Sequence, residues 1–197
     1  MNDKAHNFKV VIVGDVGVGK TCIFKCIRGD IFEENVLTTV GADKGIYHDD
    51  ETISPVSLEL WDTAGQEAYR NFLPIYFRGV QAALVVYSID LKDSFDSIDY
   101  WVQELAKYSI KIIYLVENKS DIRGDNLAIP LISLEEGEKK ATKLDVKFAS
   151  VSAKTGSGVK DLFHCISQDC LNLKQNDTMS NNTSVDLNSN QQEKSCC

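Results

Sequence analysis

Residues 14–21 read GDVGVGKT and match the pattern G-x-x-x-x-G-K-[ST]. In this pattern successive backbone N–H groups hold phosphate oxygens, the lysine reaches the β- and γ-phosphates, and the next hydroxyl binds Mg²⁺. Here these side chains belong to Lys20 and Thr21. The glycines would let the backbone approach the phosphates more closely than a Cβ allows. An apolar run, Phe8–Val13, precedes the loop and a helical pattern follows it, which a chance glycine-rich turn would not require. The segment therefore predicts a site for a nucleoside triphosphate.

Two later segments indicate which base is bound. Asn118-Lys119-Ser120-Asp121 follows an apolar run that we predict to be a strand, and Ser152-Ala153-Lys154 follows another. Both segments should therefore lie at the same sheet edge as the phosphate loop. A carboxylate such as Asp121 can accept hydrogen bonds from guanine N1–H and N2–H₂, whereas adenine has no N1–H. Alone, Asp121 would be an ordinary solvated loop carboxylate, but in this combination it predicts guanine.

Composition narrows the class of protein. The chain has 197 residues, of which 43% are hydrophobic, and this fits one domain with a substantial core. A net charge of −8 argues against nucleic acid as a partner. We find no signal peptide, no N-myristoylation site and no apolar run of membrane-spanning length. The six cysteines show no disulfide or zinc spacing, so buried, reduced thiols in a cytosolic protein are expected.

Apolar runs alternate with helical patterns along the chain. Strands are predicted at Phe8–Val13, Val56–Trp61, Ala82–Ser88, Ile110–Val116 and Val146–Ser150, with a weaker polar strand at Lys44–His48. Helices are predicted at Lys20–Arg28, Tyr69–Phe77, Asp93–Tyr108, Leu134–Leu144 and Val159–Leu171. Ser133 and Glu136 form a capping box for the fourth helix. Because several strands are continuously apolar, they suit a parallel sheet covered on both faces.

These elements predict an α/β fold of the P-loop NTPase class. It would have a doubly wound, six-stranded, mostly parallel sheet with about five flanking helices, and its ligands would bind at the carboxyl ends of the strands. From Lys174 the composition turns to Asn, Ser, Thr and Gln, which cannot form a core. We therefore expect a domain at residues 1–173 and a disordered tail at residues 174–197.

The chain resembles a small GTPase of the Ras superfamily, and within it the Rab family. The resemblance covers Phe8 to about Leu171, and every nucleotide motif is present in order. Residues 58–90, LELWDTAGQEAYRNFLPIYFRGVQAALVVYSID, carry the Rab-like features: Trp61 before DTAGQE, then YFRG and VVYSID. A Rho-type insertion is lacking. The terminal pair Cys196-Cys197 is similar to the doubly geranylgeranylated ending of Rabs and differs from a C-a-a-X box.

The resemblance implies a GTP/GDP switch that uses Mg²⁺ and has specific site residues. Gln66 would orient the attacking water and Lys20 would stabilise the transferred phosphate. Thr21 and Thr39 would ligate Mg²⁺ directly and Asp62 through water, with Thr38 as a rival to Thr39. The nucleotide would be bound by Asp15, Val16, Gly17, Val18, Gly19, Lys20, Thr21, Cys22, Phe32, Thr39, Gly65, Asn118, Lys119, Asp121, Ser152, Ala153 and Lys154. Phe32 would pack over guanine, Lys119 would cover its other face and the Ala153 amide would contact the base oxygen. Core packing is the alternative for Phe32.

The resemblance also implies partners and a location. The partners are a guanine nucleotide exchange factor, a GTPase-activating protein, a prenylation escort, a GDP-dissociation inhibitor and effectors that bind the switch loops. A monomer would cycle between the cytosol and the cytoplasmic face of intracellular membranes, anchored by lipid at Cys196 and Cys197. Residues 174–197 carry two lysines against three acidic residues, so their net charge of −1 offers no attraction to anionic lipids.

Three positions depart from the Rab pattern. Val16 stands where a small residue is usual, and its isopropyl group could crowd Gln66 and slow hydrolysis. Lys44 stands where an aromatic residue is usual, and it would either lie over Trp61 or, as we expect, point to water. Glu117 precedes Asn118 where glycine is common, and we expect its side chain to turn to solvent. A hydrolysis-deficient, GTP-bound interaction module is therefore the alternative function, whereas a P-loop ATPase or nucleotide kinase is disfavoured.

Overall fold

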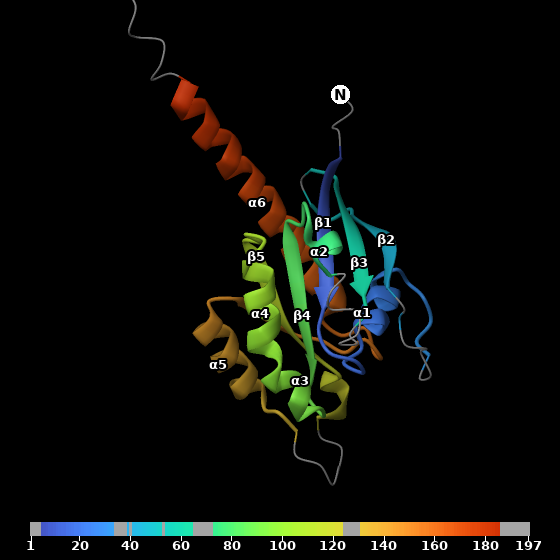
Figure 1. The fold of residues 1–197 in the computed structure, drawn as a ribbon. Coiled ribbons are helices and arrows are strands. Elements are labelled where there is room, and N and C mark those ends of the chain that lie inside the picture. Colours follow the sequence, from blue (N-terminus) through green and yellow to red (C-terminus); the bar gives the residue numbers. More distant parts are fainter. Residues whose placement is uncertain are drawn as a thin grey trace, which may run out of the picture.

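The computed structural model describes residues 5–33, 39, 41–52, 54–64, 73–123 and 131–185. Its strands are β1 (His6–Val13), β2 (Ala42–Asp49), β3 (Val56–Thr63), β4 (Ala82–Ser88), β5 (Ile112–Asn118) and β6 (Lys147–Ser150). Its helices are α1 (Lys20–Ile27), α2 (Leu73–Phe77), α3 (Lys92–Asp96), α4 (Ile98–Ala106), the short 3₁₀ helix η2 (Ser120–Ile122), α5 (Leu134–Leu144) and α6 (Val159–Val185). The order of strands and helices confirms the predicted α/β fold (Figure 1).

The strands form one sheet in the order β2-β3-β1-β4-β5-β6. β2 pairs antiparallel with β3, and the other neighbouring strands pair in parallel. Strand order therefore reverses direction around β1, because β3 lies on one side of it and β4 on the other. Loops that follow the parallel strands share one edge, which is where open α/β sheets bind ligands.

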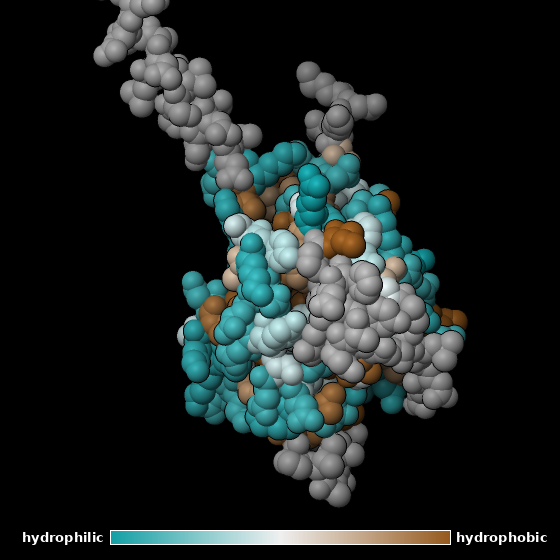
Figure 2. Space-filling view, viewed as in Figure 1, coloured by the Kyte–Doolittle hydropathy of each residue, from teal (hydrophilic) through white to brown (hydrophobic). Residues whose placement is uncertain are grey.

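Two apolar clusters cover the two faces of the sheet. Within β1, Val10 and Ile12 face one cluster, and Val11 and Val13 face the other, as the alternation of a strand requires. The first cluster packs α1 and α6 against the sheet, and the second packs α2, α3, α4 and α5. On the face shown in Figure 2, hydrophilic residues dominate and the apolar ones are scattered. The large apolar side chains of the described strands thus serve mainly the interior.

Two element predictions need correction. The strand predicted at Lys44–His48 is an eight-residue edge strand, β2, because its backbone pairs along its whole length with β3 in spite of its polar side chains. The helix predicted at Asp93–Tyr108 is divided into α3 and α4 at Ser97. Residues 65–72 lie outside the described residues, so only the second part of the helix predicted at Tyr69–Phe77 is observed, as α2.

Helix α6 extends well beyond its predicted end at Leu171 and reaches Val185 (Figure 1). The predicted disorder from Lys174 is therefore wrong for residues 174–185. The segment lacks glycine and proline, and extending an anchored helix costs far less than nucleating one. Lys174 adds a local contact, since its Nζ lies 3.0 Å from His6 Nδ1 and 5.9 Å from the Phe8 ring centroid. No helix in the described part of the chain is long and apolar enough to cross a membrane.

Candidate functional site

The phosphate loop runs from the end of β1 to the start of α1. Gly19 caps α1 with a left-handed backbone (φ 91°), and its carbonyl accepts the Ile23 N–H at 3.0 Å. The loop needs glycine for a reason that sequence reasoning missed. A Cβ at Gly14 would overlap the Val86 carbonyl oxygen, and one at Gly19 would overlap Asn118 Nδ2. Contacts within the protein therefore already require these glycines, whatever a phosphate would add.

Lys20 is the first residue of α1, and its side chain is almost fully buried. Its Nζ donates to the carbonyl oxygens of Gly14 at 2.9 Å and Asp15 at 2.7 Å. Burial lowers the pKa of Lys20 to about 8, although the nearby carboxylates of Asp62 and Asp15 oppose this shift. The folded chain thus holds a poorly solvated cation inside the loop, where an anion would stabilise it.

Three oxygen-bearing side chains from different elements meet beside Lys20. Thr21 of α1 donates to Asp62 Oδ2 at 2.7 Å, and Thr39 donates to the same oxygen at 3.3 Å. The two threonine Oγ1 atoms lie 2.8 Å apart. Asp62 belongs to β3 and is fully buried, which raises its pKa against the opposing effects of the Thr21 hydrogen bond and the Lys20 charge. Thr38, the rival to Thr39, lies outside the described residues.

This group fits the magnesium ion that the sequence predicts. Hydroxyl and carboxylate oxygens are hard ligands, and Mg²⁺ commonly binds through one or two carboxylates, substrate phosphates and water. Among the described residues, Asp62 Oδ1 is a buried oxygen with no hydrogen-bond partner. A cation bound between Thr21, Thr39 and Asp62 would satisfy this oxygen and offset the cost of burying the carboxylate.

The predicted base-recognition residues also come together. Asn118, at the end of β5, donates from Nδ2 to the Val18 carbonyl at 2.8 Å and so reaches the phosphate loop. Its Oδ1 accepts the Ala153 N–H at 3.1 Å, while Asp121 Oδ1 accepts the Ser152 hydroxyl at 2.6 Å. Two segments about thirty residues apart in sequence are thereby joined at one edge of the sheet. Lys154 is exposed on the same loop.

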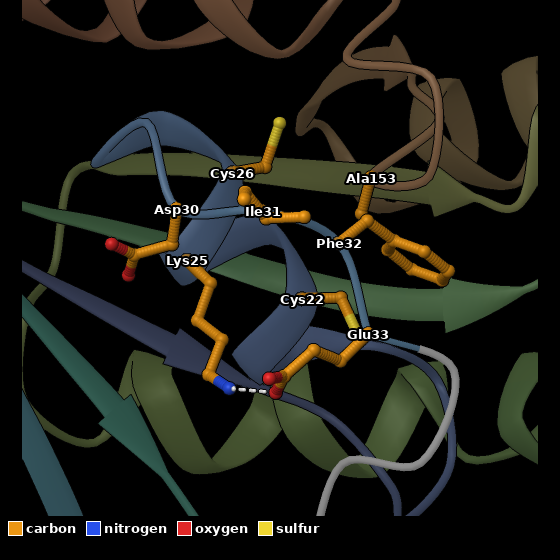
Figure 3. A pocket seen from close by; sticks show the side chains of 8 residues that line it. All are labelled: Cys22, Lys25, Cys26, Asp30, Ile31, Phe32, Glu33 and Ala153. Atoms are coloured by element: carbon orange, nitrogen blue, oxygen red, sulfur yellow. Dashed lines mark hydrogen bonds and ion pairs between the residues drawn. The ribbon is translucent and has the colours of Figure 1, made fainter.

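A pocket beside these residues lies between α1 and the loop that carries Ala153 (Figure 3). Cys22 and Cys26 of α1 line it together with residues 30–33 and Ala153. Phe32 contributes to the pocket wall and remains 37% exposed, which argues against the alternative that it is a core residue. Its packing over guanine stays a prediction. The Lys25–Glu33 ion pair, 3.0 Å long, ties the segment to α1.

Two partners of site residues could not be found from local sequence. Asp15 Oδ1 accepts the indole N–H of Trp101, a buried residue of α4, at 2.9 Å. Lys119 has a left-handed backbone (φ 64°), and its Nζ lies 3.1 Å from Asp90 Oδ2. Both pairs join segments that are distant in sequence, so only the tertiary structure reveals them.

Comparison with known proteins identifies the family. The Ras family matches residues 9–172 of the chain. The GTP-binding protein ypt2 of Schizosaccharomyces pombe is 31% identical over 204 aligned positions that span 100% of both chains. The Ras-related protein RabC of Dictyostelium discoideum is 34% identical over 96% of this chain and 97% of its own. The Ras-related protein Rab-8B of Pongo abelii is 33% identical over 88% of this chain and 84% of its own.

The chain is a divergent Rab-family member of the Ras family. The predicted recognition is thus confirmed. Two predicted site residues of this Rab, Gly65 and Gln66, lie outside the described residues, as do Cys196 and Cys197. Val16 is 42% exposed, so its isopropyl group projects from the phosphate loop and does not contribute to the core. Because Gln66 lies outside the described residues, crowding between Val16 and Gln66 stays a prediction.

At Lys44 of this Rab, the structure shows the alternative of a contact over Trp61, although the side chain remains 49% exposed. Lys44 Nζ lies 5.3 Å from the Trp61 ring centroid and 2.9 Å from Glu59 Oε2. The same Glu59 accepts the Trp61 indole N–H at 2.7 Å, and Lys9 Nζ lies 4.6 Å from the ring centroid. The β2–β3 pairing places Lys44 directly opposite Trp61, which explains the contact.

Glu117 also contradicts its prediction, because its carboxylate is fully buried and does not face solvent. Strand alternation causes this placement, since Asn118 faces the phosphate loop and its neighbour must face the other side of the sheet. Among the four cysteines that the structure describes, the expectation of buried thiols holds for Cys170 alone, whose pKa burial raises to about 12. Of the other described cysteines, Cys22 and Cys26 are half-buried and Cys165 is exposed, because α6 turns Cys165 outward.

Proposed function

We propose that this Rab-family protein is a molecular switch that binds GTP and GDP with Mg²⁺, hydrolyses GTP slowly and recruits effectors in vesicle trafficking. The observation that carries the proposal is the meeting of Thr21, Thr39 and Asp62 beside the buried Lys20. These residues come from the phosphate loop, from residue 39 and from β3, and together they offer three hard oxygen ligands at the place where Mg²⁺ would accompany the phosphates. The name of a relative, GTP-binding protein ypt2, supports the same ligand.

The residues have distinct roles in this proposal. The amides of residues 16–21 and the Lys20 ammonium bind the phosphates, while Asp121 selects guanine. Thr21 and Thr39 hold Mg²⁺, which supplies electrostatic stabilisation of phosphate charge, and Asp62 acts through water. Gln66 orients the attacking water. Thr39 joins the first switch segment to this site, so loss of the terminal phosphate would release that segment from α1 and β3.

Nucleotide content tests the proposal directly. The protein purified without added nucleotide should carry GDP or GTP and no adenine nucleotide, because Asp121 leaves adenine unmatched. The Asp121→Asn variant should lose preference for GTP and gain affinity for XTP, whose 2-oxo group can accept from an amide. A wild-type protein that binds ATP as tightly as GTP would contradict the proposal.

The alternative of a hydrolysis-deficient, GTP-bound interaction module rests on Val16. This side chain is β-branched and exposed on the phosphate loop, where it could misplace the catalytic water. GTP-loaded protein that shows no turnover in a single-turnover assay, even with an activating protein, would favour the alternative. Measurable turnover would favour the hydrolysing switch.

The remaining parts of the proposal concern location and partners. We propose a GTPase domain at residues 1–173 and a tail from 174 that carries lipid on Cys196 and Cys197. Its partners would be an exchange factor, an activating protein, a prenylation escort, a GDP-dissociation inhibitor and effectors, with the protein itself monomeric. It would cycle between the cytosol and the cytoplasmic face of intracellular membranes. The Lys44–Trp61–Glu59 group gives its effector surface a charged character.

A further inference from the structure

Glu117 lies at the end of β5, and three side chains bind its buried carboxylate. Oε2 accepts from the Tyr87 hydroxyl at 2.9 Å and from Arg123 Nη2 at 2.6 Å, while Oε1 accepts from the Ser150 hydroxyl at 2.8 Å. The sheet register pairs Glu117 with Tyr87 of β4 and with Ser150 of β6. Adjacent strands therefore supply two neutral donors, and Arg123 supplies the charge.

Arg123 is the cation that compensates Glu117. Among the described residues, Arg123 is the cation that pairs with this carboxylate. Its side chain is 31% exposed, whereas that of Glu117 is 0% exposed. Burial and the neighbouring carboxylate raise the pKa of Tyr87, so the phenol stays protonated and donates a hydrogen bond to Glu117. A buried carboxylate that lost the arginine would be left without a counter-charge, which strongly disfavours the observed arrangement.

The ion pair closes the segment that carries the guanine motif. The chain leaves β5 after Asn118, reverses at the left-handed Lys119 and passes through η2. It returns to Glu117 through the Arg123 guanidinium. Arg123 N–H also donates to the Ser120 carbonyl at 3.2 Å. Asn118 and Asp121 lie inside this closed segment. Both ends of the base-recognition loop are therefore fixed at one residue.

The second base-recognition loop is fixed at the same place. Val151 N–H donates to the Glu117 carbonyl at 2.8 Å, and Ser120 N–H donates to the Val151 carbonyl at 3.1 Å. The Ser152 hydroxyl then donates to Asp121. A shift of η2 away from Glu117 would therefore move the Asp121 carboxylate and disturb the hydrogen bond that orients it.

We propose that the Glu117–Arg123 ion pair positions Asp121 and thereby sets the strength of guanine selection in this protein. Both are positioning residues, because they act on the base through the loop that they close. The inference rests on the proposed binding of guanine nucleotides. It predicts that weakening the pair affects recognition of the base more than recognition of the phosphates.

The test compares GDP with IDP, which lacks the 2-amino group that Asp121 would bind. Affinities are measured for the full chain by displacement of a fluorescent GDP in the presence of Mg²⁺. Arg123→Met should lower the ratio of GDP to IDP affinity by roughly tenfold or more, because a hydrogen bond to a charged group is lost or misdirected. Arg123→Lys should restore part of the ratio, since it returns the positive charge.

Lys140→Met is the matched control, because it breaks an ion pair with Asp99 between α5 and α4 and leaves the guanine loops untouched. Its ratio should equal that of the wild type. An Arg123→Met ratio that also equals the wild-type ratio would overturn the proposal. If circular dichroism shows that Arg123→Met does not fold, the isosteric Glu117→Gln variant takes its place. Its ratio of GDP to IDP affinity should also fall, and a wild-type ratio would overturn the proposal. A wild-type protein without any preference for GDP over ADP would instead overturn the proposed function.

Discussion

At the scale of single residues, the site is dominated by groups whose burial disfavours their charge. Lys20 and Asp62 both belong to elements packed in the interior. Burial lowers the pKa of Lys20 and raises the pKa of Asp62, so the neutral form of each becomes more favourable. Their own hydrogen bonds compensate only in part, because Asp62 Oδ1 lacks a partner among the described residues. Such a site favours ligands that bring opposite charges, namely a phosphate for Lys20 and a cation for Asp62.

The lowered pKa of Lys20 predicts that nucleotide binding takes up protons. With a pKa of about 8, Lys20 is only partly protonated near pH 8, and a bound phosphate would raise its pKa and favour its protonation. We therefore expect a net uptake of protons when GDP binds at pH 8. Calorimetry at this pH in two buffers of different ionisation enthalpy measures the number. Equal heats in both buffers would contradict the prediction.

A second residue-scale prediction concerns Val16. Its replacement by a smaller side chain should free space for the catalytic water and speed hydrolysis, by up to about 10²-fold if the crowding displaces the water by about 1 Å. Single-turnover GTP hydrolysis by wild type, Val16→Gly and Val16→Ser measures the effect. GDP affinity serves as the control, since it should change little. Equal hydrolysis rates would remove the idea.

At the scale of elements, the site forms where the carboxyl ends of β1, β3 and β5 meet the loop after β6. Local signals predicted most of these elements, including the capping box of α5, in which the Ser133 hydroxyl accepts the Glu136 N–H. Side chains that cross between elements were harder to predict. Lys44 and Glu117 were both expected to face solvent, yet β2–β3 pairing and β5 burial hold them against protein partners.

Packing of α5 against the sheet predicts the effect of Gly137→Ala. A Cβ at Gly137 would overlap the Tyr87 hydroxyl oxygen and lie 2.8 Å from Phe148 Cε2. Overpacking costs about 1–3 kcal/mol, while alanine regains about 1 kcal/mol of helix propensity, so we expect a net loss of up to about 2 kcal/mol of unfolding free energy. Urea unfolding followed by circular dichroism measures the loss. Glu138→Ala, at an exposed position of the same helix, should change stability by less than about 0.5 kcal/mol.

At the scale of the whole molecule, a sheet with helices on both faces presents its ligand site at one edge and extends α6 from its body (Figure 1). The described helices offer no membrane-spanning candidate, and the acidic balance of residues 174–197 offers no electrostatic attraction to anionic lipids.

Lipid attachment is testable by replacing both cysteines. The Cys196→Ser/Cys197→Ser variant should be wholly cytosolic after cell fractionation, because stable anchoring requires two membrane-binding signals and the two lipid chains would supply them. Each single variant should show partial loss, since one chain remains. Cys165→Ser, at an exposed position on α6, is the control and should fractionate like the wild type. Membrane pelleting of the double variant at wild-type levels would refute the prediction.

The sequence by itself determined the parts of this protein that depend on local pattern. The phosphate loop, the guanine motif, the alternation of strands and helices and the family resemblance are all carried by residues close together in the chain. The sheet edge where the motifs meet also followed, because parallel strands with helical crossovers place their carboxyl ends together.

Tertiary structure alone decided the contacts made by residues far apart in sequence. Trp101 holds Asp15 across 86 positions, and Lys44 lies against Trp61 although each could have faced water. Glu117 is buried because Tyr87 and Ser150 reach it from the neighbouring strands, while Arg123 returns to it from the loop six residues further along. A charged side chain is buried only where such partners exist, and their arrival depends on packing between elements, which the local sequence does not specify.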